Sequence, residues 1–142
     1  MIENSSESAT VAQPAFFAST YEEAFQLVLE ARHYLGERSR PEVTALGVEA
    51  TLAYSVESMR MTARLTQVMA WLMAMRAAHE GELSRDELSE ERWRLGGHEV
   101  CLADATQGTE ALPAGFRDLI ERSERLFVRI SRLDRLSAGE AA

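Results

Sequence analysis

His98 and Cys101, spaced H-x-x-C, are the residue pair whose types and spacing come closest to a chemical site. Imidazole nitrogen and thiolate sulfur are good zinc ligands, but a zinc site needs four protein ligands, or three and a water molecule. The remaining histidines, His33 and His79, lie far away in the sequence, and no second pair of this kind exists. We therefore expect no metal site.

Other catalytic patterns are also incomplete. His79-Glu80 lacks the second histidine of the zinc-protease helix motif. The carboxylates of Glu87, Glu90 and Glu91 are typical of a solvated helix face, and Gly96-Gly97 is typical of a helix end. We expect a protein that is not an enzyme and that holds no cofactor.

Length and charge narrow the class of protein. The chain has 142 residues, enough for one domain, and a formal net charge of −8 with no lysine and 15 arginines. An acidic balance argues against a general nucleic-acid binder, because phosphate contacts need clustered cations. The single cysteine excludes an internal disulfide and fits a reducing compartment.

The apolar run VMAWLMAM, Val68 to Met75, raises the question of a membrane. A spanning helix needs about 20 apolar residues, whereas this run is shorter and is flanked by Arg64 and Arg76. The start of the chain, MIENSSESATVAQPA, has no basic region followed by an apolar one, as a signal peptide would. We expect a soluble cytoplasmic protein without membrane contact.

Helical periodicity dominates the rest of the chain. Apolar spacings of three and four predict helices over about 20–35, from 43 or 47 to 80, and over 113–136, with no strand signal. Capping boxes at Ser19–Glu22 and Ser84–Glu87 predict helix starts, the second for a short helix over 84–95. The fold expected is all-α, an antiparallel three-helix bundle with an extra short helix between the second and third helices.

The same patterns divide the chain into three parts. Residues 1–15 are polar and aperiodic and are predicted to be a disordered arm. Residues 16–136 form the helical domain, the stretch 96–111 inside it is predicted to be a loop, and residues 137–142 are predicted to be a flexible tail.

The long second helix carries three stripes. Two are apolar: one runs from Val48 through Met59 to Met73, the other from Tyr54 through Leu65 to Met75. The third is polar: Glu57, Arg60, Arg64 and Gln67 are predicted to be exposed and to bind a protein partner. Trp71, one turn on, is predicted to belong to the same partner-binding residues.

The second half of this helix lacks a polar face. Trp71 is predicted to be buried, either under the 84–95 helix or at a protein interface, where tryptophan is enriched. Two further helices are too few to cover this half, so we expect a homodimer. Its predicted interface is Val68, Trp71, Leu72 and Met75.

Several stretches resemble one alphaproteobacterial family, the regulators of CtrA degradation, or RcdA family. The strongest is AYSVESMRMTARLTQVMAWLMAMRAAHEGEL, residues 53–83, which resembles the family's central helix. Phe16-Phe17 with Tyr21-Glu22 resembles the entry to its first helix, and Leu112 to Ser123 resembles its third helix. The resemblance spans about residues 16–135.

The resemblance implies a three-helix bundle that dimerises and acts as an adaptor of the ClpXP protease. In such a hierarchy a response-regulator-like factor primes ClpXP, and the adaptor then docks. It brings protein substrates, or a further cyclic-di-GMP-binding adaptor, so that cell-cycle regulators are degraded, often at a cell pole. The final Ala141-Ala142 also resembles the tags that ClpX recognises, although alanine-rich tails are common in chains of this composition.

The alternative is a small helical regulator that binds a transcription factor or a nucleic acid. Its support is a series of arginines in the last helix: Arg122, Arg125, Arg129, Arg132 and Arg135. Glu121, Glu124 and Asp134 are interleaved with them, which is more typical of a salt-bridged helix surface. We therefore expect no nucleic-acid partner.

Overall fold

The computed structural model describes residues 14–140, and this part of the chain is helical without strands. Its elements follow in order: α2 (Pro14–His33), a π-helical turn (Tyr34–Arg38), α3 (Ser39–Thr44), α4 (Val48–His79), α5 (Arg85–Leu88), a 3-10 turn (Glu91–Trp93), α6 (His98–Cys101), a second 3-10 turn (Thr109–Ala111) and α7 (Ala114–Ser137). The all-α prediction is confirmed. Residues 1–13 of the predicted arm and the terminal Ala141-Ala142 lie outside the described residues.

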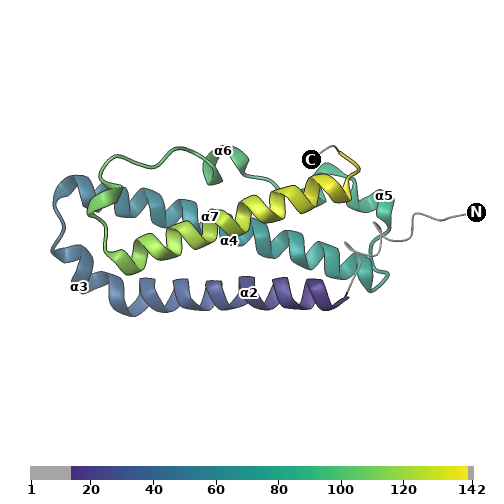
Figure 1. The fold of residues 1–142 in the computed structure, drawn as a ribbon, viewed down its shortest axis with the longest axis horizontal. Helices are drawn as coiled ribbons and strands as arrows, with labels where there is room; N and C mark the ends of the chain where they lie inside the picture. Colours follow the sequence, from purple (N-terminus) through teal and green to yellow (C-terminus); the bar gives the residue numbers. More distant parts are fainter. Residues whose placement is uncertain (1–13, 141–142) are drawn as a thin grey trace, which may run out of the picture.

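The long helices α2, α4 and α7 pack lengthwise against one another (Figure 1). Ion pairs link Glu23 to Arg129 and Glu30 to Arg122, so α2 and α7 are antiparallel. In the contacts between α4 and α7, residue numbers increase together along both helices: the ring of Tyr54 lies against Phe116, and the Trp71 indole N–H donates to Asp134. The expectation of an antiparallel bundle is therefore wrong for this pair, because α4 and α7 are parallel.

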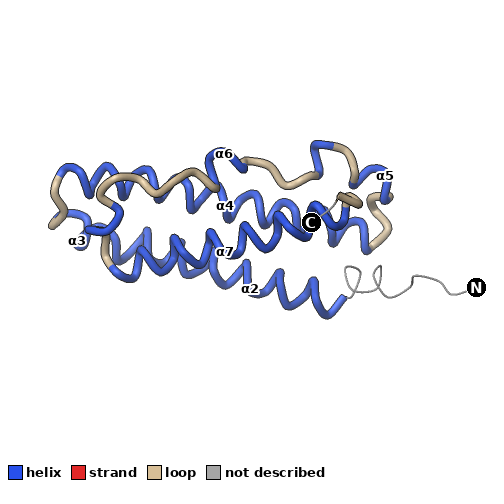
Figure 2. The backbone as a smooth tube through the Cα atoms, turned by 45° about the horizontal axis from the view of Figure 1, so that its top comes forward, coloured by secondary structure: helices blue, strands red, loops and turns tan. Residues whose placement is uncertain are grey.

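The parallel arrangement requires a long connection. We call residues 80–113 the crossover segment, because they run from the end of α4 back to the end of the bundle where α4 began (Figure 2). Within it α5, α6 and the 3-10 turn at Thr109–Ala111 each contact α4. The segment thus covers one side of α4 along its length.

The predicted helix boundaries match the structure best where they depend on residues close together in the sequence. Ser84 and Glu87 form the predicted capping box, with both reciprocal hydrogen bonds present. The helix that they open ends at Leu88, and a 3-10 turn follows instead of a helix to residue 95. The predicted loop 96–111 contains α6 and a 3-10 turn, which are short enough to show no periodicity.

The beginning of the bundle is more helical than predicted. α2 starts at Pro14, where proline suits a first turn, so Ser19 lies inside the helix and does not cap it. The connector expected at 36–42 continues as the π-helical turn and α3. Pro41 falls in the first turn of α3, where its missing N–H costs no hydrogen bond.

The core contains apolar side chains from the three long helices together with Leu95, Cys101 and Leu112 of the crossover segment. From α4 it takes Met61, Leu65, Val68, Trp71, Leu72 and Met75. The apolar stripe from Tyr54 to Met75 therefore faces the core. The stripe from Val48 to Met73 does not.

Candidate interaction surface

The polar stripe of α4 lies inside the molecule. Glu57 is 2% exposed and Arg64 is 1% exposed, while Arg60 keeps 19% of its side chain accessible. The prediction that these residues form an exposed surface for a partner is wrong. Periodicity placed them on one face correctly, but the crossover segment and α7 cover that face.

Glu57 and Arg60 fasten the crossover segment to α4. Arg60 Nη1 donates to Glu57 Oε1 at 2.9 Å and to the carbonyl oxygen of Asp104 at 2.7 Å. Thr106 donates to the same carboxylate oxygen from its backbone N–H at 3.2 Å and from its hydroxyl at 2.9 Å. The buried carboxylate is thereby satisfied, as a buried charge must be.

Arg64 joins three elements at the centre of the bundle. Its Nε donates to the Cys101 carbonyl oxygen at 2.8 Å, and its Nη1 donates to the Ile120 carbonyl oxygen and Ser123 Oγ at 3.3 Å each. Burial lowers the pKa of the Arg64 guanidinium, and the nearby Glu124 carboxylate opposes that shift. Arg64 therefore holds α4, α6 and α7 together inside the protein.

Gln67 performs the same task one turn further on. Its Oε1 accepts a hydrogen bond of 3.1 Å from the Gly96 N–H. A side chain added at Gly96 would meet this amide at 3.3 Å, so the glycine lets the crossover segment approach α4 closely. Glu57, Arg60, Arg64 and Gln67 therefore position the crossover segment.

Trp71 is buried, as predicted, with 2% of its surface exposed. Its indole N–H donates to Asp134 Oδ1 at 3.0 Å, and Arg94 Nε donates to both oxygens of the same carboxylate at 3.0 Å. Arg94 also pairs with Glu140 at 2.9 Å. The hydrogen bond to Asp134, and after it the one to Glu140, contributes most to raising the pKa of Arg94 above its ordinary value.

The residues predicted as a dimer interface are covered by their own chain. Val68 is fully buried, and Leu72 and Met75 are 2% and 8% exposed. As with Trp71, the cover comes from the same molecule. The expectation that a second copy covers these four residues is wrong, because the crossover segment supplies a further layer that the sequence did not reveal.

The exposed apolar surface of α4 lies on the opposite stripe. Val48, Leu52, Met59 and Met73 are 81%, 63%, 72% and 55% exposed. We call this the outer face, and its members are Val48, Leu52, Ser55, Val56, Met59, Thr62, Thr66, Ala70 and Met73. At 1.5 Å per residue it extends over roughly 38 Å.

The polar members of the outer face turn their hydroxyl groups inward. Ser55, Thr62 and Thr66 each donate to the backbone carbonyl four residues earlier, at 3.2, 2.8 and 2.7 Å. A hydroxyl bonded to its own helix has less need of water, and Thr62 and Thr66 are exposed residues. The outer face is thus more apolar than its composition indicates.

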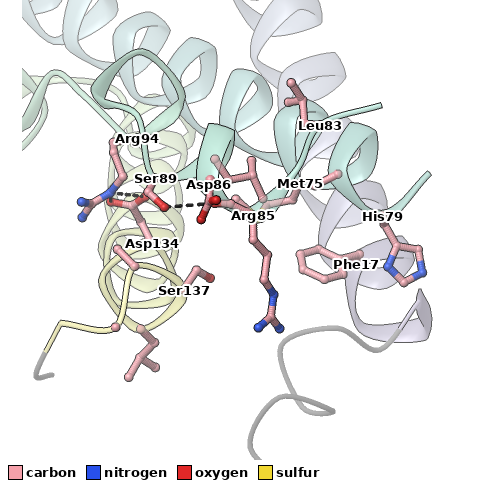
Figure 3. Close-up of a pocket in the computed structure, with 15 residues that line it drawn as sticks. Phe17, Met75, His79, Leu83, Arg85, Asp86, Ser89, Arg94, Asp134 and Ser137 are labelled. Atoms are coloured by element: carbon pink, nitrogen blue, oxygen red, sulfur yellow. Dashed lines mark hydrogen bonds and ion pairs between the residues drawn. The ribbon is translucent and has the colours of Figure 1, made fainter. Parts of the chain in front are cut away.

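A cleft of about 570 Å³ opens at the end of the bundle where the start of α2, the end of α4, α5 and the end of α7 meet (Figure 3). Phe17, Met75 and Leu88 contribute apolar lining, and the Arg94–Asp134 pair lies at one side. That pair is already engaged with Trp71 and Glu140. The cleft therefore offers an apolar recess next to a neutralised ion pair.

The candidate metal ligands do not come together. His98 Nε2 lies 3.2 Å from Ser131 Oγ, and its ring meets Phe127 edge to face. Cys101 is buried, and burial raises the pKa of its thiol above the ordinary value while Arg64 opposes the shift. Among residues 14–140 no group of three or more His, Cys, Asp or Glu side chains could hold a metal ion. None of the described helices is both long and apolar enough to cross a membrane.

Fold and surface together define a helical-bundle protein with a long apolar outer face. The chain belongs to the family described as "Protein of unknown function (DUF1465)", whose model matches residues 8–142. It is also similar to RcdA from Caulobacter crescentus, whose crystal structure is known. The two sequences are 38% identical, the structures match with a TM-score of 0.71, and the match covers 88% of this chain and 92% of that chain. The predicted membership of the RcdA family is confirmed. No match was found among curated proteins.

Proposed function

We propose that this protein is a noncatalytic adaptor that docks on ClpXP after a response-regulator-like factor has primed the protease. It delivers protein substrates, or a cyclic-di-GMP-binding adaptor, for the regulated proteolysis of cell-cycle regulators. This delivery takes place in the cytoplasm, including the cell pole. The observation that carries the proposal is the outer face of α4, because an adaptor acts through surfaces alone.

Leaving the outer face in water costs free energy. Burying one Val, Leu or Met side chain is worth about 1.5–3 kcal/mol. Val48, Leu52, Met59 and Met73 are each more than half exposed, so a partner that covers them gains several such contributions. Methionine is flexible and polarisable, which suits a surface that accepts more than one partner.

A second copy of the chain is the first partner that we assign to the outer face. Two antiparallel α4 helices would form a twofold interface in which the same patch is used on both copies. This replaces the interface expected from Val68, Trp71, Leu72 and Met75, which their own chain covers. Substrates would use the same kind of apolar contact.

The test is the pair of substitutions Leu52→Glu and Met59→Glu in the full-length protein. Both side chains are exposed, so the variant should fold like the wild type but remain monomeric in sedimentation at micromolar concentration. In a reconstituted degradation assay with primed ClpXP, delivery of cargo should fall about tenfold or more, which corresponds to about 1.4 kcal/mol.

Val100→Glu is the matched control, because Val100 is 52% exposed on α6 and lies outside the outer face. It places one such negative charge on an exposed apolar position and should change neither self-association nor delivery. Unchanged self-association and delivery in the Leu52→Glu, Met59→Glu variant would refute the role of the outer face.

A further inference from the structure

The arginines of α7 fall into two groups. Arg122 pairs with Glu30 and Asp118, and Arg129 pairs with Glu23, so these two connect α7 to α2. Hydrogen bonding to Glu30 raises the pKa of Arg122 above its ordinary value. The predicted salt-bridged surface is thus found in this group.

The second group is Arg125, Arg132 and Arg135, which we call the arginine row. All three are exposed, and none forms an ion pair with the described part of the chain. Their spacing of seven and three residues places them on one face of α7, over about 15 Å at 1.5 Å per residue. Val128, half-buried, lies on the same face between Arg125 and Arg132.

Arg32 and Arg85 are also exposed without an ion pair to a described residue, but they lie singly, whereas these three arginines lie together on one helix although acids are in excess. The chain has 23 Asp and Glu residues against 15 arginines, yet this row has no partner among the described ones. Glu121 precedes Arg125 by one turn without an ion pair between them, and Glu124 instead lies 3.7 Å from Arg64. Arg135 also lies in the last turn of α7, where a cation favours the helix dipole. That explanation does not apply to Arg125 and Arg132, which lie further inside the helix.

We propose that the arginine row is a docking surface for an acidic helical segment of a protein partner. Carboxylates at helical spacing would meet the three guanidinium groups, and an apolar side chain between them would meet Val128. A mixed charged and apolar row fits a helix better than a phosphate backbone, which offers no apolar group. The net charge of −8 opposes every anionic partner, and it opposes a long polyanion such as nucleic acid more strongly than a short segment with a few carboxylates.

This surface is distinct from the outer face, so the inference goes beyond the proposed function. The α4 side chains that contact α7, among them Arg64 and Trp71, lie roughly 120–140° round the helix from Met59 at 3.6 residues per turn. The outer face and the arginine row therefore point to different sides of the bundle. Each can be removed without touching the other.

The experiment uses full-length protein and a fluorescein-labelled helical peptide of about 18 residues, since shorter isolated helices are marginal in water. The peptide carries Glu at positions i, i+3, i+7 and i+10 with Leu between them, and its partner probe carries Gln in place of Glu. A short DNA duplex serves as the third probe. Fluorescence anisotropy measures affinity, and ¹⁵N NMR of the arginine Nε–H groups locates the contact.

We expect the Glu peptide to bind, the Gln peptide to bind at least tenfold more weakly, and the affinity to fall with added salt. The Nε signals of Arg125, Arg132 and Arg135 should shift more than those of Arg122 and Arg129. Arg125→Glu with Arg132→Glu should weaken binding at least tenfold, whereas Arg125→Lys with Arg132→Lys should retain most of it.

The matched control is Arg32→Glu with Arg85→Glu, which makes the same change in net charge at two exposed arginines elsewhere. Equal weakening in both double variants, no binding of the Glu peptide, or preferential binding of the duplex would each overturn the proposal. Self-association through the outer face should persist in the Arg125→Glu, Arg132→Glu variant. Peptide binding should likewise persist in the Leu52→Glu, Met59→Glu variant, so the two proposals fail separately.

Discussion

Trp71 of α4 and Asp134 of α7 are joined by a hydrogen bond of 3.0 Å although 63 positions separate them in the chain. Both side chains are buried, at 2% and 4% exposure. Arg94 neutralises the carboxylate, so the indole bonds to a charge that is already balanced. This contact ties the crossover segment and the two parallel helices together at one point.

Trp71→Ala should therefore destabilise a single chain. Removing a buried tryptophan costs about 3–5 kcal/mol, whereas Trp71→Phe keeps most of the volume and loses the hydrogen bond, at about 1–2 kcal/mol. Urea denaturation followed by far-UV circular dichroism measures both. Equal stability of Trp71→Ala and wild type would contradict the burial of this side chain within its own chain.

The fluorescence of Trp71 should report its surroundings directly. Trp93 is the other tryptophan, so a Trp93→Phe background isolates the signal. We expect blue-shifted emission and slow quenching by iodide, because the ring is buried and independent of a second chain. The emission should stay the same on dilution to nanomolar protein. A red shift on dilution would mean that a partner copy supplies the cover.

Cys101 offers a chemical test of the crossover segment. The thiol is fully buried and burial raises its pKa, so it should react slowly with a thiol reagent in the native protein. Arg64→Met removes the hydrogen bond to the Cys101 carbonyl and leaves buried acceptors without a donor, which costs about 1–3 kcal/mol for each unsatisfied group. The thiol should then react markedly faster. Val100→Glu, an exposed change on the same short helix, should leave the rate unchanged.

Gly108 should tolerate a side chain poorly. Its φ is +93°, and a Cβ there would approach Glu49 Cγ to 3.0 Å. Gly81 has a similar φ of +82° with open space around it, so it separates backbone strain from crowding. We expect about 1–3 kcal/mol for Gly81→Ala from strain alone, and more for Gly108→Ala. Thermal unfolding compares them, and equal losses would rule out the close contact.

The Glu30–Arg122 pair should make the stability of the folded protein depend slightly on pH in the acidic range. The hydrogen bond from Arg122 is the main cause that lowers the pKa of Glu30 below its ordinary value of 4.5. A lowered folded pKa means that the stabilisation is fully present above 4.5 and is lost as pH falls through the lower folded value. Because the Glu30 side chain is 47% exposed, solvent screening keeps the contribution below about 1 kcal/mol.

Glu30→Gln removes the titrating carboxyl group, so the stability of this variant should depend less on pH in the acidic range. Chemical denaturation between about pH 5 and about pH 3 should show wild type losing slightly more stability than the variant. Glu22→Gln, at an exposed position of α2, controls for the loss of one negative charge. The same slope in Glu30→Gln and wild type would show that the pair does not respond to protons.

Local signals in the sequence predicted local structure well. The end of α4 near Gly81 and the capping box of Ser84 and Glu87 depend on residues a few positions apart, and both were found. The arrangement of the faces of α4 depends on residues far along the chain. Glu57 is buried because Thr106 reaches it, and Met59 is exposed because nothing in the described part of the chain covers it.

A polar stripe on a helix ordinarily indicates solvent, and the sequence carries no sign that a distant loop supplies its hydrogen bonds. One available signal was the presence of Ser and Thr within the stripe from Val48 to Met73. A core stripe of that length would hold larger side chains. The parallel direction of α7 had no local signal, since a connection of this length can lead either way.

The crossover segment also has a consequence for how the chain acquires its structure. The contacts that hold α7 are distant in sequence: Arg64 reaches Ile120 over 56 positions, and Arg129 reaches Glu23 over 106. Contacts of such separation form slowly, because a long loop must close before they contribute. While the ribosome is still making α7, the part of α4 that packs against α7 lacks this cover, and Trp71 lacks its partner Asp134. A nascent or truncated chain that ends before Ala114 would therefore present to chaperones and proteases a surface that the finished protein hides.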